Sequence, residues 1–296
     1  MRRIVLVLVV FLLGACAARQ GVVDDATTPI SDGALQPYRY RTGIVYTPPG
    51  WPERLRGDLY APEAAGSELR PAVVLVHGGA WFRGNRGEMI HIAQALAERG
   101  YIAFSVDYRL VPQARYPAPV DDVRVAVRWL DAHADELGVD RRRIALWGYS
   151  SGAQIAALLA ADAQPGAPRI KAAVLGAMPA DLVQMADLRI VERYIGLPLD
   201  EARDAYVSAS PLARINAHSA PMFLYHGSWD WMIGPDNARR MYAGLQALGV
   251  TSELYLQPGT GHFTTFLYDR GALRAALAFL DRQLDVAPPA LIATTP

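Results

Sequence analysis

The sequence has a single cysteine, Cys16, among its 296 residues. An intramolecular disulfide is therefore excluded, and the fold must be held by its core. The chain also lacks an excess of charge, because 29 Lys and Arg residues balance 29 Asp and Glu residues. A neutral chain has no general basic surface for polyanions, so we expect no nucleic-acid partner. The six histidines are scattered without the spacing of metal ligands, which predicts neither a metal nor another cofactor.

The N-terminal apolar run, residues 4–13, is too short to span a bilayer. It follows the positive Arg2 and Arg3, and leads into Leu13-Gly14-Ala15-Cys16, a pattern typical of an export signal. Those four residues resemble the lipobox of bacterial lipoproteins, in which the cysteine is lipidated and becomes the new N-terminus. Ala17, rather than Asp, after the cysteine then favours the outer membrane.

We therefore expect residues 1–16 to be a signal peptide removed before Cys16, the protein to be exported to the cell envelope, and its membrane contact to be a lipid at Cys16. The alternative is an ordinary signal peptide cleaved near Ala15-Cys16-Ala17, which gives a periplasmic or secreted protein. The oligomeric state does not follow from the sequence.

The rest of the chain divides into a long periodic region and two aperiodic ends. Residues 17–36 contain Asp, Thr, Gly and Pro without periodicity and predict a flexible tether, while residues 286–296 predict a loose tail. Residues 37–285 alternate apolar runs with helix-period segments, which predicts one α/β domain of three layers. Several runs are continuously apolar, as in parallel strands covered on both faces. We expect a mainly parallel, eight-stranded sheet with the strands Ile44–Thr47, Leu55–Tyr60, Ala72–His77, Ile102–Asp107, Arg143–Trp147, Ala172–Ala177, Met222–His226 and Thr251–Leu256.

Helices are expected on both faces of this sheet, because right-handed crossovers join parallel strands. Residues 181–219 break the alternation with two prolines and only short helical patches. Such an excursion in a doubly wound sheet lies above the carboxyl ends of the strands, where ligands bind. It is interpreted as a small cap, with a plain surface insertion as the alternative. The main helices are predicted at Glu88–Arg99, Val120–Glu136, Ala153–Ala161, Asn237–Leu248 and Ala272–Leu284.

The most informative motif is Gly148-Tyr149-Ser150-Ser151-Gly152. It lies between a predicted strand and a predicted helix, so Ser150 is placed on a sharp, strained turn that exposes its hydroxyl. Gly148 and Gly152 must be small because the turn brings them close together. The pattern predicts a nucleophilic serine.

A serine nucleophile needs a base and an acid that orients the base. Asp230 follows the strand that ends at His226, and His262 follows the last strand behind Gly261. Both would lie on the sheet edge that carries Ser150, in the order Ser, acid, His that α/β-hydrolase sheets use. Asp236 is the rival acid, although its place after Pro235 favours a helix N-cap. We expect a loop to carry His262 over the nucleophile.

The chain resembles the hormone-sensitive-lipase-like and bacterial feruloyl-esterase-like branches of the α/β-hydrolases. Beyond the motifs above, the resemblance rests on His77-Gly78-Gly79-Ala80-Trp81 and covers about residues 40–284. It implies an oxyanion hole made by the N–H groups of Gly79, Ala80 and Ser151. It implies a structural role for His77, which holds in place the loop that begins at Gly78. The other matching motifs are Gly57-Asp58-Leu59-Tyr60, Asp107-Tyr108-Arg109-Leu110, Tyr116-Pro117-Ala118-Pro119 with Asp121 or Asp122, and Ser210-Pro211-Leu212.

These motifs together predict a serine carboxylesterase that hydrolyses short-chain or aryl esters, feruloyl and acetyl esters among them, through an acyl-enzyme. Ala80 replaces a third glycine, and the resulting His-Gly-Gly-x-Trp loop also resembles kynurenine formamidases. An arylformamidase-type amidase is therefore the alternative. A catalytically inactive binding protein on a hydrolase fold is less favoured, because the chain keeps every triad residue and the loop glycines.

Overall fold

The fold is built on one twisted sheet, seen in a computed structural model that describes residues 18–20, 36–63, 68–162, 168–268 and 270–286. The strands follow the order β1-β9-β8-β7-β6-β4-β5-β3-β2, and β4 to β9 run parallel to one another. Each of the remaining three pairs antiparallel with its neighbour, β1 with β9 on one side of the sheet, and β3 with β5 and β2 with β3 on the other. The strands are β1 (Ala18–Gln20), β2 (Tyr38–Val45), β3 (Arg56–Pro62), β4 (Arg70–Val76), β5 (Ile102–Val106), β6 (Val139–Tyr149), β7 (Ile170–Gly176), β8 (Met222–Gly227) and β9 (Ser252–Gln257).

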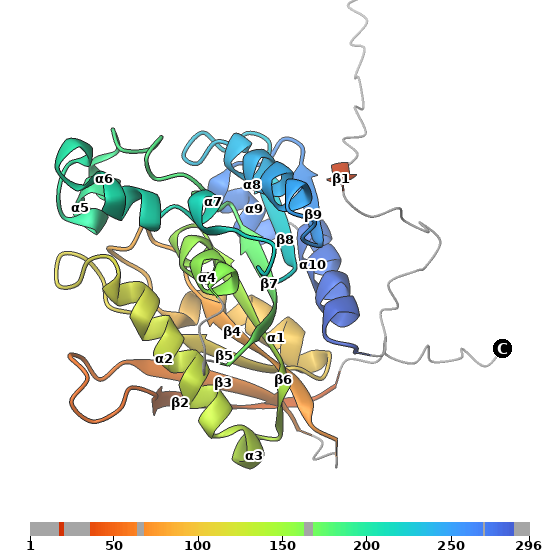
Figure 1. Cartoon of the computed structure of the whole chain (residues 1–296). Coiled ribbons are helices and arrows are strands. Elements are labelled where there is room, and N and C mark those ends of the chain that lie inside the picture. Colours follow the sequence, from red (N-terminus) through yellow and green to blue (C-terminus); the bar gives the residue numbers. More distant parts are fainter. Residues whose placement is uncertain (1–17, 21–35, 64–67, 163–167, 269, 287–296) are drawn as a thin grey trace, which may run out of the picture.

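Helices cover both faces of the sheet and make the outer two layers (Figure 1). Alternate residues of β4 point to opposite faces, so Val74 and Val76 join one core cluster while Val73 and Leu75 join the other. The first cluster contains the apolar sides of α2, α4 and α8, and the second those of α1 and α10. The predicted three-layer α/β architecture is confirmed. The covering helices are α1 (Ile90–Glu98), α2 (Ala118–Ala132), α4 (Ser151–Ala161), α8 (Asp236–Ala247) and α10 (Arg270–Gln283).

The eight predicted strands are present, and the structure adds a ninth. The short strand β1 lies within the segment predicted as a tether and pairs with the outer edge of β9, Ala18 opposite Leu256. A strand of three residues has no apolar run by which the sequence could predict it. It forms because the edge strand β9 offers unpaired backbone N–H and C=O groups. The other residues of the predicted tether, apart from Gln36, lie outside the described residues, as do Cys16, the signal peptide and all but Val286 of the predicted tail.

Two helix predictions need correction. The single helix predicted over Val120–Glu136 is divided into α2 and α3 (Ala134–Leu137) at His133, whose ring N–H donates to the carbonyl of Trp129. His262 was expected on a loop but begins the helix α9 (His262–Tyr268). This helix spans only seven residues, too few for a helical period to be read reliably.

The segment predicted as a cap carries three short helices after β7. They are α5 (Arg189–Ile195), α6 (Leu199–Ser208) and α7 (Pro211–Arg214). A short 3-10 turn, η1 (Arg86–Met89), precedes α1 on the other face. Within the described residues, no helix has both the length and the apolar character needed to cross a membrane.

Candidate active site

Ser150 occupies the tight turn between β6 and α4. Its backbone has φ 53° and ψ −121°, a conformation that residues other than glycine rarely adopt. The turn brings Gly148 and Gly152 so close together that a Cβ on Gly148 would lie only 2.3 Å from the carbonyl oxygen of Gly152. A Cβ on Gly152 would lie 2.2 Å from the carbonyl oxygen of Val76 in β4. Both positions therefore require glycine, and together they press the nucleophile turn against the end of the neighbouring strand.

Ser150, His262 and Asp230 form a hydrogen-bonded chain. The Ser150 hydroxyl lies 3.0 Å from Nε2 of His262, and Nδ1 of His262 lies 2.7 Å from Oδ2 of Asp230. All three side chains are buried. This arrangement gives the hydroxyl a base at hydrogen-bond distance and gives that base an orienting carboxylate.

A second imidazole, that of His226 at the end of β8, also contacts Asp230. Nε2 of His226 donates to the carbonyl of Ile233 at 2.7 Å and lies 3.2 Å from Oδ2 of Asp230. The other carboxylate oxygen accepts the N–H groups of Met232 and Ile233. Burial alone raises the pKa of Asp230, but the donors His226 and His262 outweigh it and hold that pKa well below its usual range. Asp230 is therefore an anion at neutral pH.

The rival acid, Asp236, does not reach the histidine. It is the first residue of α8, after Pro235 at the N-cap position, and its exposed carboxylate pairs with Arg239 at 2.8 Å. The prediction that Asp236 is the N-cap is therefore wrong by one residue, because the cap position belongs to Pro235.

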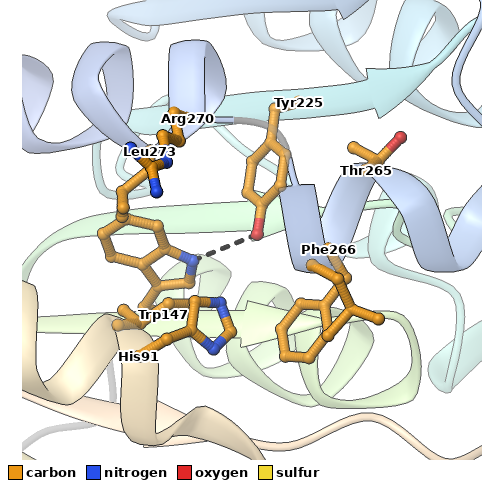
Figure 2. Close-up of a pocket in the computed structure, with 9 residues that line it drawn as sticks. His91, Trp147, Tyr225, Thr265, Phe266, Arg270 and Leu273 are labelled. Carbon is orange, nitrogen blue, oxygen red and sulfur yellow. Dashed lines mark hydrogen bonds between the residues drawn. The ribbon is translucent and has the colours of Figure 1, made fainter.

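Contacts between α9 and Tyr149 hold His262 in place. The hydroxyl of Tyr149, next to the nucleophile, donates to the backbone carbonyl of His262. Phe266, one turn later, packs its ring 4.5 Å from that of Tyr149 and 4.8 Å from that of His91 in α1. Phe266 and His91, together with Trp147 and Tyr225, line a pocket of about 40 Å³, and Figure 2 shows these four side chains. A space of this size suits a water molecule rather than a substrate, so we regard it as packing behind the catalytic helix.

The loop after β4 approaches the nucleophile from the opposite side. A Cβ on Gly78 would lie 3.4 Å from Cβ of Ser150 and 3.1 Å from the carbonyl oxygen of Tyr149. The backbone then passes through left-handed conformations, with φ 113° at Gly79 and 51° at Ala80. The N–H of Ser151, at the first turn of α4, has no partner within the helix. The structure thus brings the start of the loop that carries the predicted donors Gly79 and Ala80 against the turn of Ser150, and the third predicted donor, Ser151, directly follows the nucleophile.

Trp81 follows with φ 62°, and a buried network holds its strained backbone. The indole N–H donates to Oε1 of Gln154 at 3.0 Å, and the ring stacks 4.3 Å from that of Tyr194 in α5. The Tyr194 hydroxyl contacts the same Gln154 oxygen, while the Gln154 amide donates to the carbonyl of Ala209. The network therefore joins the oxyanion loop to the helix after the nucleophile and to the predicted cap.

His77 is enclosed at the start of this loop. Burial lowers its pKa to about 4, although its hydrogen bond to Gly78 and the charge of Asp107 act in the other direction. Its ring stacks 4.3 Å from that of Tyr108, whose hydroxyl donates to the backbone carbonyl of His77. A neutral, enclosed imidazole with these contacts supports the structural role implied by the resemblance and does not provide a second base.

Two ion pairs involve the Asp-Tyr-Arg-Leu motif that follows β5. Arg109 pairs with the fully buried carboxylate of Asp122 at 2.8 Å, which also accepts the indole N–H of Trp51. Arg86 pairs with Asp107 and with Asp58 of β3. Neither pair touches the triad, so the motif ties the surrounding loops to the sheet.

Sequence reasoning did not single out His226, Gln154 or Tyr194. In the sequence pattern His226 ends an apolar strand and Gln154 is one polar residue of an Ala-rich helix, so neither position indicates a role in the site. Their partners are distant in sequence, so only the fold reveals the contacts. Within the part of the chain that the structure describes, no group of three or more His, Cys, Asp or Glu side chains could hold a metal ion.

The sequence of this chain matches the model of a known protein family. The family model BD-FAE matches residues 57–245, which include Ser150 and Asp230 and end before His262. The chain belongs to the BD-FAE family. Its fold and site motifs are those of α/β-hydrolase serine esterases.

Curated and solved relatives agree with this family. Esterase LipC of Mycobacterium tuberculosis is 30% identical over 83% of this chain and 68% of its own length. The isoprenylcysteine α-carbonyl methylesterase ICME of Arabidopsis thaliana is 32% identical over 77% of this chain and 58% of its own. The chain thus spans about three fifths to two thirds of these relatives. A truncated carbohydrate esterase from gut microbiota superposes with a TM-score of 0.74 at 19% identity, over 86% of this chain and 99% of its own, which shows the shared fold.

Proposed function

We propose that this protein is a serine carboxylesterase. The observation that carries the proposal is the hydrogen-bonded chain from the Ser150 hydroxyl through His262 to Asp230, at 3.0 Å and 2.7 Å. Its position opposite the Gly79–Ala80 loop gives the site both a nucleophile and N–H donors for an oxyanion. Membership of an esterase family and the esterase relatives support the same reaction.

The geometry suggests the following sequence of steps. Ser150 attacks the ester carbonyl as its proton moves to Nε2 of His262, and Asp230 stabilises the imidazolium that forms. The N–H groups of Gly79, Ala80 and Ser151 stabilise the tetrahedral oxyanion. The bond between the carbonyl carbon and the alcohol oxygen then breaks as His262 gives its proton to that oxygen, and the acyl group stays on Ser150. A water molecule next attacks the acyl carbonyl as His262 takes one of its protons. The bond to the Ser150 oxygen breaks as His262 returns that proton to it, and the acid is released.

A panel of p-nitrophenyl esters, methyl ferulate, acetylated xylan and N-formyl-kynurenine tests this proposal, with Ser150→Ala as the control. We expect turnover of carboxylic esters that Ser150→Ala abolishes. Unchanged turnover in Ser150→Ala would refute the mechanism. Selective cleavage of N-formyl-kynurenine would replace the esterase by the arylformamidase-type amidase that the His-Gly-Gly-x-Trp loop also resembles.

We also propose export to the cell envelope with a lipid anchor at Cys16, with the outer membrane as the favoured location. The support is the sequence pattern that ends in Leu13-Gly14-Ala15-Cys16. Radioactive palmitate should label the protein and fail to label Cys16→Ser. Labelling that survives this substitution would contradict the lipobox.

A further inference from the structure

Large apolar side chains are exposed beside the catalytic acid and base. Trp229 and Trp231 flank Asp230 and are 73% and 88% exposed, while Phe263 and Leu267 of α9 are 55% and 56% exposed. Phe263 and Leu267 are four residues apart, so they lie on the same side of the helix. We call the exposed set the His-side surface; it consists of Trp229, Trp231, Met232, Phe263 and Leu267.

This surface is next to the reacting groups. The ring of Phe263 meets the imidazole of His262 edge to face, with centroids 5.5 Å apart. The N–H of Trp229 donates to the carbonyl of Thr260 at 2.9 Å, so the loop that carries Asp230 runs beside the loop that leads into His262. The two segments therefore form one continuous wall on the histidine side of Ser150.

The segments that carry Trp229, Trp231, Met232 and Phe263 have no exposed formal charge, whereas Leu267 also lines the pocket behind α9 together with the exposed Arg270. Residues 228–235 and 258–268 contain one Asp, Glu, Lys or Arg residue, Asp230, and this residue is buried. Exposed apolar residues that cluster beside a site, rather than being scattered, mark a binding surface. Aromatic rings with aliphatic neighbours and no charges favour an apolar ligand.

The chemistry of the triad decides which part of an ester meets this wall. His262 must deliver its proton to the leaving alcohol oxygen, so the alcohol portion lies against the imidazole. The carbonyl oxygen turns toward the Gly79–Ala80 loop. We propose that the His-side surface binds the alcohol portion of the substrate, and that the enzyme prefers esters of bulky apolar alcohols. This inference rests on the proposed esterase function and adds the substrate class.

Two isomeric esters test it without changing total apolarity. Hexyl acetate carries its chain on the alcohol, and methyl heptanoate carries it on the acyl group. Both release aliphatic alcohols, which avoids the strong activation that a phenol leaving group would bring. We expect kcat/KM for hexyl acetate to exceed that for methyl heptanoate by about tenfold, the low end of what one methylene contributes in a closed apolar pocket, because this surface is open to solvent. Benzyl acetate should resemble hexyl acetate.

Substitution of the surface should remove this preference. In Phe263→Gln, and in the double variant Trp231→Gln with Leu267→Gln, we expect kcat/KM for hexyl acetate to fall by about tenfold, mainly through KM. The ratio of kcat/KM for hexyl acetate to that for methyl acetate should therefore fall by about tenfold. Denaturant unfolding of each variant reports whether it folds. Leu248→Gln is the matched control, because Leu248 is an exposed leucine at the C-terminal end of α8. It precedes β9 and so lies at the end of the strands opposite to the one that carries the triad.

Three outcomes would overturn the inference while leaving the esterase intact. The first is equal kcat/KM for the two isomers, and the second is a preference for methyl heptanoate that the variants do not alter. The third is faster turnover of a sugar acetate than of hexyl acetate with loss in the Trp231 variant, which would make the surface a carbohydrate platform. Failure of the esterase proposal looks different, because no ester, including methyl acetate, would then be turned over through Ser150.

Discussion

The two walls that flank Ser150 hold their groups in opposite ways. On the oxyanion side, Gly79, Ala80 and Trp81 adopt left-handed backbone conformations, and a buried network around Gln154 fixes them. On the histidine side Asp230 and His262 are buried, but exposed aromatic residues surround them. Contacts within the protein fix the oxyanion loop, beside which Phe82 is exposed, whereas the histidine side exposes a cluster of apolar side chains that a substrate could cover.

This difference follows from what each wall must do. An oxyanion hole stabilises charge only if its donors are fixed before the reaction, so strain held by packing is useful there. A wall that meets the variable part of a substrate needs area rather than directed donors. Substitutions on the two sides should therefore differ in kind: the oxyanion side should affect kcat, and the His-side surface should affect KM.

The largest effect is expected at the acid. In Asp230→Asn, the side chain can no longer hold His262 in the tautomer that accepts the Ser150 proton, and we expect kcat to fall by about 10⁴-fold. Asp236→Asn is the matched control and should change kcat by less than about twofold, because Asp236 is exposed and pairs only with Arg239. Steady-state kinetics on one acetate ester measures both. Equal losses in the two variants would contradict the assignment of the acid.

A smaller effect is expected from the network behind the oxyanion loop. Gln154→Leu leaves the Trp81 indole N–H and the Ala209 carbonyl without their partner, which frees the loop to relax. We expect kcat to fall by about 10- to 100-fold with little change in KM, somewhat less than the loss of an oxyanion donor.

The exposed Gln184 gives a control for this change. Gln184→Leu makes the same substitution at a residue that contacts Arg240 on the surface, and should leave kcat unchanged. Denaturant unfolding of both variants separates a loss of fold from a loss of alignment. An unaltered kcat in a folded Gln154→Leu variant would show that the oxyanion loop does not depend on this network.

Much of the sheet and the triad could be predicted from the sequence. The buried parallel strands are continuous apolar runs, and Ser150, Asp230 and His262 each follow one of them, so their shared edge could be inferred. His226 and Gln154 could not, because their roles depend on contacts with residues that only tertiary folding brings near. The strand β1 and the helix α9 were missed because elements this short take their conformation from neighbours rather than from a period of their own.

The smallest effect is one of pH on stability, and it also belongs to the oxyanion side. The pKa of His77 is about 4 in the fold, against 6.5 for an ordinary histidine. As pH falls from about 6.5 toward 4, the unfolded chain binds a proton that the folded chain does not, so this histidine costs stability, up to about 3 kcal/mol. His77→Phe keeps a ring on Tyr108 and removes the titration. The free energy of unfolding, measured at pH 7 and pH 5, should fall less in His77→Phe than in the wild type; equal falls would contradict a neutral His77.

The account depends most directly on Ser150 as the nucleophile. A fluorophosphonate probe forms a stable adduct with an activated serine, and mass spectrometry of the digested protein locates it. We expect one adduct per chain, on Ser150, with labelling retained in Ser151→Ala and lost in both Ser150→Ala and His262→Ala. Labelling of Ser151 or Ser228 in the wild type, or labelling that persists in Ser150→Ala, would contradict the central claim.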